Sequence, residues 1–282
     1  MSAPLSTTCR RLSGVLAIFG ALMAADTKPA GEKLSLNYEI PLWEESKVPL
    51  AAGDGPLDKP FLTVFLPPEG KRNSGSIVVA PGGGNIMLMY GSEGLEIAER
   101  YNEWGVTAFV LTYRLAPRYR DDARILDAKR AMQLVRYRAA QFQLDPAKVG
   151  FIGFSAGSTL GHSVAAAAGP GDPNAADPVD RLSSRPDYLG LVYGPGRVAP
   201  GESLKNFPPT FLLSAQADTG NAVGSAQLFA ELTRAGVTAE IHVYQKGRHG
   251  FGSAFATPIY SDWMGRLQRF LQQGGFLPEA TK

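Results

Sequence analysis

The feature that most constrains the fold of this chain is a pentapeptide of the form G-x-S-x-G, from Gly153 to Gly157. Residues 148–152 before it are typical of a short buried strand, and the small residues 158–168 after it are typical of a helix. This order matches the nucleophile elbow, a strained turn that holds a serine hydroxyl clear of a sheet. A β-carbon at either glycine would crowd the neighbouring strand or helix. Because the chain has 32 glycines, a chance Gly/Ser turn is the alternative.

Strand-like and helix-like segments alternate from residue 76 onward. Strands are expected at 34–40, 61–66, 76–80, 106–112, 148–152, 188–193, 210–215 and 239–244, and helices at 93–104, 121–142, 158–168, 222–235 and 261–272. Each parallel crossover needs a helix, so the pattern predicts an α/β fold whose mostly parallel sheet carries helices on both faces. No linker interrupts the alternation, which predicts one domain over residues 34–282 after a polar linker at 26–33.

The first 25 residues have the pattern of a secretory signal peptide. Arg10 and Arg11 precede an apolar run, residues 12–25, that ends in small residues suited to cleavage. The run is short for a membrane span, and a retained N-terminal anchor is the alternative. The only cysteine, Cys9, would leave with the peptide. We therefore expect a secreted or periplasmic protein without disulfides and without a stable membrane span after signal removal.

The net charge and the placement of the histidines limit which partners, metals and cofactors are expected. The net charge is +2 and no block of like charges or basic stripe is present, so no nucleic-acid partner is expected. No H-E-x-x-H motif occurs and the three histidines are scattered, so neither a metal nor a cofactor is expected. The sequence leaves the oligomeric state open.

A serine hydroxyl needs a base, usually an imidazole. His162 lies seven residues after Ser155 on the same expected helix, about 10 Å away along the axis, which is too far. His242 lies inside the last expected strand and is interpreted as a strand-face residue. His249 follows that strand in a glycine-flanked loop, at the edge where open α/β sheets place active groups. His249 is therefore the candidate base.

The base needs an acid to orient it. Asp218 follows the strand expected at 210–215 and again stands at a carboxyl end. Asp187 begins a strand and should lie at the opposite edge, whereas Asp262 comes after the base in the chain. Asp218 is therefore the candidate acid.

Backbone N–H groups would stabilise the oxyanion of an acyl transfer. The glycine triplet Gly82 to Gly84 follows the strand at 76–80, and Ala156 follows the serine. The alternative is a phosphate-binding loop, but neither G-x-x-x-x-G-K-[ST] nor G-x-G-x-x-G is present. Gly83, Gly84 and Ala156 are the candidate oxyanion-hole residues.

From about residue 76 to 252 the chain resembles the α/β-hydrolase superfamily. Within it, the chain is similar to bacterial carbohydrate esterases of the acetylxylan esterase-like, hormone-sensitive-lipase type. The resemblance rests on residues 79–84, 107–115, 127–131, 135–136, 153–157, 180–187 and 249–252. It implies a serine esterase that removes short acyl groups, typically acetyl, from carbohydrate such as xylan, with Ser155 as nucleophile, Asp218 as acid and His249 as base.

Three departures from the family pattern fall where substrate should bind. Ser158 and Thr159 replace a Gly and a His, Asn85 replaces an aromatic residue, and Ser92 replaces a His. Asn85, Met87 and Ser158 are the candidate pocket residues.

The alcohol side of the site is expected to be open. About 16 residues separate the strands at 188–193 and 210–215, too few for a helical lid domain, so an open, shallow site is expected. Two other functions stay open: a peptidase or amidase of the same fold, and a catalytically silent binding module.

Overall fold

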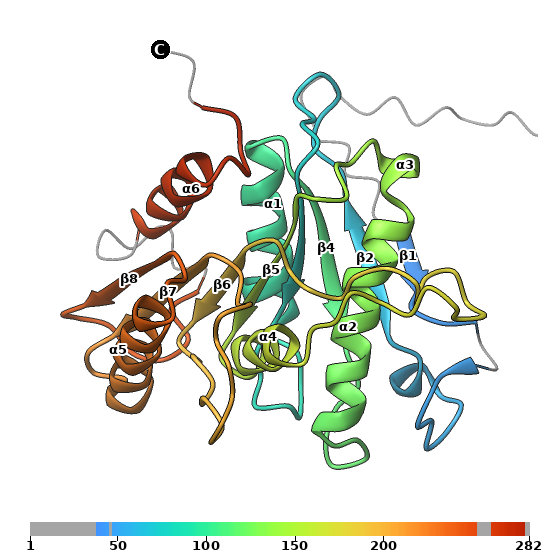
Figure 1. Cartoon of the computed structure of the whole chain (residues 1–282), viewed down its shortest axis with the longest axis horizontal. Helices are drawn as coiled ribbons and strands as arrows, with labels where there is room; N and C mark the ends of the chain where they lie inside the picture. The colour runs from blue at the N-terminus through green and yellow to red at the C-terminus, as the bar shows by residue number, and fades with distance from the viewer. Residues whose placement is uncertain (1–37, 45–46, 253–260, 280–282) are drawn as a thin grey trace, which may run out of the picture. The chain divides into compact units, whose positions relative to one another are not determined.

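The core of the computed structural model is an eight-stranded sheet (Figure 1) with the strand order β1-β2-β4-β3-β5-β6-β7-β8. The structure describes residues 38–44, 47–252 and 261–279, so the expected signal peptide and linker lie outside the described residues. The strands are β1 (Tyr38–Pro41), β2 (Phe61–Phe65), β3 (Ser76–Ala80), β4 (Thr107–Thr112), β5 (Val149–Phe154), β6 (Leu189–Val192), β7 (Thr210–Ala215) and β8 (Ala239–Tyr244).

The six strands from β3 to β8 run parallel to one another, and only the pairs β1–β2 and β2–β4 are antiparallel. All five residues of β3 and all six of β5 are buried, because helices cover both faces of a parallel sheet. In the register of these two strands, Ala80 lies beside Gly153. The carboxyl ends of the six strands therefore meet at one edge, and the expected α/β-hydrolase fold is confirmed.

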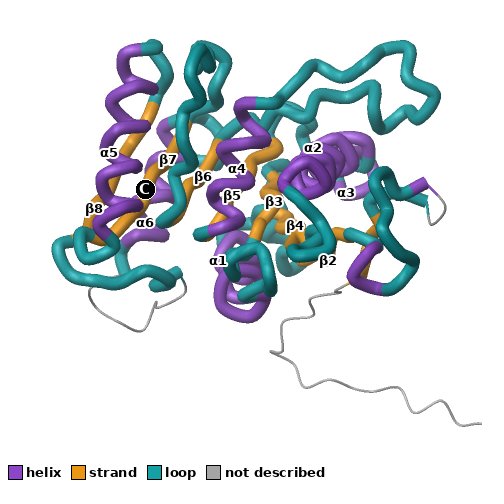
Figure 2. Tube along the Cα trace, turned by 90° about the horizontal axis from the view of Figure 1, so that it is seen from below, coloured by secondary structure: helices purple, strands orange, loops and turns teal. Residues whose placement is uncertain are grey.

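Helices cover both faces of the sheet. They are η3 (Tyr90–Leu95), α1 (Glu96–Glu103), α2 (Asp121–Tyr137), α3 (Ala139–Phe142), α4 (Ala156–Ala166), α5 (Thr219–Arg234) and α6 (Trp263–Gln273), with a short 3₁₀ turn, η2 (Pro56–Asp58), before β2. Figure 2 shows α2, α4 and α5 on one side of the sheet and α1 on the other. The apolar residues divide accordingly into one core under α2 to α5 and another under α1 and α6. None of the described helices is both long and apolar enough to span a bilayer.

All five expected helices are found with ends shifted by at most three residues, and two of them also differ in geometry. The helix expected at 93–104 begins three residues earlier, as the wide π-helical turn η3 that leads into α1. The helix expected at 121–142 is interrupted at Arg138, where the backbone leaves helical geometry, and continues as α3. The break lets the Phe142 ring pack edge-on against Phe109 of β4, with 5.4 Å between ring centroids. Tertiary packing thus overrides a continuous helical pattern at this point.

Candidate active site

Four loops at the carboxyl edge of the parallel strands carry the candidate residues. The glycine triplet follows β3, Ser155 follows β5, Asp218 follows β7 and His249 follows β8. The shared direction of these strands explains why residues up to 167 positions apart in the chain can meet at one edge.

Ser155 occupies the strained turn between β5 and α4. Its backbone angles are φ 51° and ψ −115°, an uncommon conformation for a residue with a side chain. A β-carbon at Gly153 would lie 2.1 Å from the carbonyl oxygen of Gly157, and one at Gly157 would lie 2.1 Å from that of Ala80. The expectation that both glycines are sterically required is confirmed. Ser155 N–H donates to the carbonyl of Val192 at 2.9 Å, which ties the turn to β6.

The structure places Ser155, His249 and Asp218 in one hydrogen-bonded line. Ser155 Oγ lies 2.7 Å from His249 Nε2, and His249 Nδ1 lies 2.6 Å from Asp218 Oδ2. The His249 side chain is 46% exposed and that of Asp218 is 15% exposed. With Nδ1–H donating to the carboxylate, Nε2 is left as the acceptor for the serine proton. The imidazole can therefore take the proton of the Ser155 hydroxyl, in a site that is open to solvent.

Asn221 is a member of this site that sequence reasoning missed. Its amide nitrogen donates to both oxygens of Asp218, at 3.0 Å and 2.9 Å, and lies 3.3 Å from His249 Nδ1. Asp218 is the N-cap of α5, so Asn221 stands three residues on, in the first turn. That i, i+3 spacing on a helix beginning at the acid is the signal that could have found it.

The glycine triplet and Ala156 present backbone N–H groups beside the serine. Gly83 and Gly84 have φ values of 127° and 65°, which residues with side chains rarely adopt. Within the described part of the chain, the N–H groups of Gly83, Gly84 and Ala156 have no acceptor. The N–H of Gly82, in contrast, donates to the buried Glu93 at 2.7 Å. The three remaining amides are suited to receive an oxyanion.

The other two histidines have structural roles. His162 is 4% exposed and packs edge-on against Phe207, while Glu202 lies 3.3 Å away. Burial lowers the pKa of His162, although Glu202 acts in the opposite direction. His242, on β8, lies 2.6 Å from Glu240. Neither histidine contacts Ser155.

The competing aspartates also lie away from the serine. Asp187 accepts hydrogen bonds from Arg136 and from the N–H of Val149, at the first residue of β5. It therefore stands at the amino edge of the sheet, opposite the site, as expected. Asp262 is paired with Arg266 at 2.6 Å and accepts the Tyr244 hydroxyl.

The candidate pocket residues have different environments. Met87 is 53% exposed, beside Ile86 at 65%, so this stretch presents apolar side chains to solvent next to the glycine triplet. Asn85 has φ 62° and its carbonyl accepts the N–H of Ala116. Ser158 is fully buried, and its hydroxyl donates to the carbonyl of Gly194. Ser158 thus holds the loop after β6 and does not face solvent.

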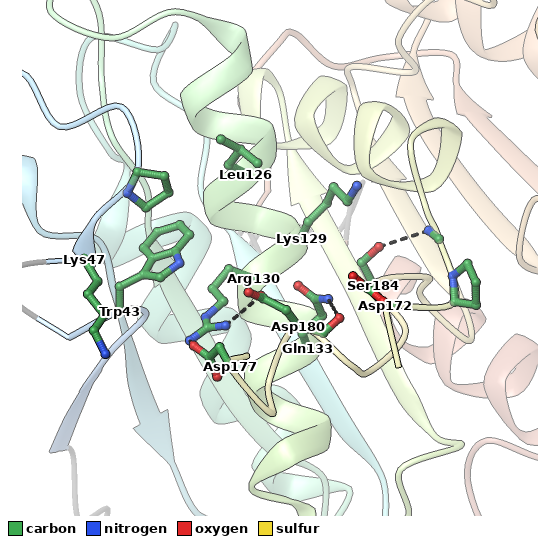
Figure 3. Close-up of a pocket in the computed structure, with 14 residues that line it drawn as sticks. Trp43, Lys47, Leu126, Lys129, Arg130, Gln133, Asp172, Asp177, Asp180 and Ser184 are labelled. Atoms are coloured by element: carbon green, nitrogen blue, oxygen red, sulfur yellow. Dashed lines mark hydrogen bonds and ion pairs between the residues drawn. The ribbon is translucent and has the colours of Figure 1, made fainter. Parts of the chain in front are cut away.

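A cavity of about 660 Å³ lies elsewhere, between the α2 helix, Trp43 and the loop 169–184 (Figure 3). Figure 3 shows Arg130 pointing from α2 toward Asp177 and Asp180, with N–O distances of 2.6 Å and 2.8 Å. None of its lining residues belongs to the candidate site. Among the described residues, no group of three His, Cys, Asp or Glu side chains could hold a metal ion.

Comparison with known proteins agrees with this architecture. A family profile described as the alpha/beta hydrolase fold matches residues 77–200. An acetylxylan esterase of Xylanibacter ruminicola is 30% identical over 217 residues, which are 69% of this chain and 44% of that protein. An endo-1,4-beta-xylanase B of Butyrivibrio fibrisolvens is 27% identical over 256 residues, 79% of this chain and 39% of that protein. The chain spans less than half the length of both relatives.

A solved structure extends the likeness over a whole protein. An acetyl ester-xyloside bifunctional hydrolase from Caldicellulosiruptor lactoaceticus is 32% identical, with a TM-score of 0.78. The match covers 85% of this chain and 97% of that one. The chain therefore belongs to the α/β-hydrolase superfamily, among the esterases that resemble hormone-sensitive lipase.

Proposed function

We propose that this protein is a serine carboxylesterase that hydrolyses short-chain, chiefly acetyl, esters on carbohydrate such as xylan. The observation that carries the proposal is the line of short contacts from Ser155 through His249 to Asp218, at 2.7 Å and 2.6 Å. A serine hydroxyl is a weak nucleophile by itself, and an oriented imidazole at hydrogen-bond distance is what activates it.

In the proposed reaction, Ser155 Oγ attacks the acyl carbon of the ester while its proton passes to His249 Nε2. Asp218 holds the imidazole in the correct tautomer and stabilises the imidazolium that forms. His249 then gives the proton to the departing sugar hydroxyl, which leaves an acyl-enzyme on Ser155. Water, deprotonated by the same imidazole, attacks this ester and releases acetate.

The negative oxygen of each tetrahedral intermediate would lie against the amides of Gly83, Gly84 and Ala156. Because these groups belong to a fixed turn and a helix start, they need no reorganisation when the charge appears. One such donor contributes roughly 3–4 kcal/mol to the stability of the transition state in other serine hydrolases.

The preference for a small acyl group and a bulky alcohol rests on the openness of the site. The His249 side chain is nearly half exposed, and residues 194–209 between β6 and β7 form a loop without a helix. A long acyl chain would need a deep apolar tunnel to leave water. Acetylated xylan is the substrate class that the names of the two relatives at 30% and 32% identity suggest.

Replacing the nucleophile tests the mechanism. Ser155→Ala should abolish hydrolysis of p-nitrophenyl acetate and acetate release from acetylated xylan, with the fold retained by circular dichroism. Mass spectrometry of the wild type quenched during turnover should show an added acetyl group on the peptide that contains Ser155. Unchanged turnover by Ser155→Ala would refute the mechanism, and faster hydrolysis of octanoyl than of acetyl esters would refute the substrate class.

We further infer that the protein is exported, because residues 10–25 have the charged flank and apolar run of a signal peptide. N-terminal sequencing of protein purified from the culture medium or periplasm should find the chain beginning near residue 26. Retention of residues 1–25 in a membrane fraction would support the anchor alternative.

A further inference from the structure

A buried carboxylate lies directly behind the oxyanion loop (residues 82–84). Glu93, on the π-helical turn η3, is only 4% exposed. Its Oε2 accepts the N–H of Gly82 at 2.7 Å, and its Oε1 accepts the hydroxyl of Tyr193 at 2.6 Å. Both oxygens therefore have a donor, as a buried carboxylate requires.

Tyr193 connects this carboxylate to the loop that carries the base. Besides donating to Glu93, its hydroxyl oxygen accepts the N–H of Gly252 at 2.9 Å. Burial, with the nearby Glu93 charge second, raises the pKa of Tyr193 well above its usual range, so the hydroxyl keeps its proton and donates. The Tyr193 ring also lies 5.0 Å from the His249 ring, centroid to centroid.

These contacts form an unbroken chain between two parts of the site. It runs from Gly82 through Glu93 and Tyr193 to Gly252, and the carbonyl of Gly252 accepts the indole N–H of Trp263 at 3.1 Å. We propose that Glu93 and Tyr193 are positioning residues that hold the oxyanion loop and the His249 loop (residues 245–252) at a fixed separation on either side of Ser155.

Close packing around the chain leaves little room for either loop to shift. A β-carbon at Gly82 would lie 2.7 Å from Glu93 Oε2 and 2.8 Å from the Ser155 β-carbon. One at Gly252 would lie 2.5 Å from the Tyr193 hydroxyl oxygen. The carboxylate and the serine thus both lie too close to Gly82 for a β-carbon to fit there. Hydrogen bonds to a carboxylate are about twice as strong as neutral ones, which suits a fixed link.

The link matters for chemistry because the two loops act on the same intermediate. The oxyanion loop receives the negative oxygen while His249 moves the proton, so the distance between them must match the tetrahedral intermediate. A displacement of about 1 Å in such a site can lower the rate by about 100-fold. The kinetic part of this inference rests on the proposed esterase activity, whereas the mechanical link between the loops does not.

Two isosteric variants test the link. In Glu93→Gln, an amide group replaces one acceptor oxygen with a donor, so one of the two donors loses its partner. In Tyr193→Phe, both Glu93 and the N–H of Gly252 lose a partner. Each variant should lower kcat for p-nitrophenyl acetate about tenfold, while KM stays within about twofold of wild type. The kcat values are calculated per active site, as counted by titration with an organophosphate. Because both act on one link, the double variant should lose little more than either single one.

Amide hydrogen exchange supplies the readout that is independent of activity. In each variant, exchange should be at least about fivefold faster in both segments, 82–89 and 245–252, although each substitution contacts only part of them. Matched controls are Asp187→Asn and Tyr188→Phe, a carboxylate and a buried tyrosine hydroxyl at the opposite edge of the sheet. The controls should leave exchange in both segments and kcat unchanged.

Faster exchange in only one segment, or unchanged kcat in both variants, would overturn the proposal. Equal effects of the controls would also overturn the proposal, because the changes would then reflect a general loss of stability and not the loss of a specific link through Glu93. If the wild type failed to hydrolyse esters, the proposed function would fall, while the exchange data would still decide whether Glu93 and Tyr193 couple the loops.

Discussion

At the scale of single residues, the site depends on a helix N-terminus that holds the acid. Asp218 is the N-cap residue of α5, and the helix macrodipole favours a negative charge at this end of the helix. Asn221 adds a donor to both carboxylate oxygens from the same turn. The acid is therefore held by its own helix before His249 arrives from a loop 31 residues further on.

Asn221→Ala should lower kcat about tenfold without a change in KM, because Asp218 loses a donor to its charged group while the substrate contacts stay intact. Asp218→Asn should cost much more, on the order of 10⁴-fold, because the wrong tautomer of the imidazole becomes favoured. Steady-state kinetics on p-nitrophenyl acetate measure both. Gln227→Ala, at an exposed position of the same helix, is the control. Equal kcat in Asn221→Ala and Gln227→Ala would contradict the role given to Asn221.

At the scale of elements, a buried ion pair joins α2 to the segment after β4. Arg114 donates from its backbone N–H and its guanidinium to the two oxygens of Asp127, at 2.7 to 3.0 Å. Neither side chain is exposed. The guanidinium also donates to the carbonyls of Pro49 and Ala123. Residues 107–115 and 127–131, which carry part of the family resemblance, therefore meet at a structural contact outside the candidate site.

Asp127→Ala should lower the free energy of unfolding by about 3–5 kcal/mol, because it leaves the Arg114 charge buried without its partner. Urea denaturation at pH 7 measures the loss. Glu44→Ala, which removes an exposed partner of Lys47, should cost less than about 1 kcal/mol. A loss for Asp127→Ala as small as that of the control would mean that water reaches Arg114 in the variant.

At the scale of the whole molecule, Asp58 ties the segment before β2 to the loop after β4. It is 1% exposed and accepts the Tyr119 hydroxyl at 2.6 Å, the Arg118 guanidinium at 2.8 Å and the N–H of Gly55 at 2.9 Å. The hydrogen bond from Tyr119, followed by that from Arg118, lowers the pKa of Asp58 from 3.8 to about 2. The folded state therefore favours the ionised carboxylate.

This lowered pKa predicts a pH-dependent stability. The pKa is lower in the folded state than in the unfolded state, so the contribution of Asp58 is complete above pH 3.8 and is lost as the pH falls toward about 2. The free-energy difference between wild type and Asp58→Asn, from urea denaturation at several pH values, should be constant near neutrality and shrink over that interval. A difference that does not change with pH would contradict the assignment.

The sequence predicts the position of a residue well where that position depends on its neighbours in the chain. Buried parallel strands are continuous apolar runs, so β3 and β7 have the predicted bounds. The candidate serine, acid and base each follow the end of a strand. The sequence predicts Glu93 only as part of a helix and does not predict its contacts, because its partners Gly82 and Tyr193 come from other elements. The break at Arg138 depends likewise on packing against β4. Such long-range contacts leave no local pattern.

The crowding around the two elbow glycines also limits how this protein can evolve. Every single-base change in the codon of Gly153 or Gly157 that alters the residue adds at least a β-carbon, 2.1 Å from a backbone oxygen. The side chains of Ile86 and Met87, in contrast, are more than half exposed to solvent. A saturation library spanning both regions and selected for folded, active protein should return only glycine codons at positions 153 and 157. At positions 86 and 87 it should return many different residues. Variation in substrate range would then accumulate on one rim of the site while its centre stays invariant.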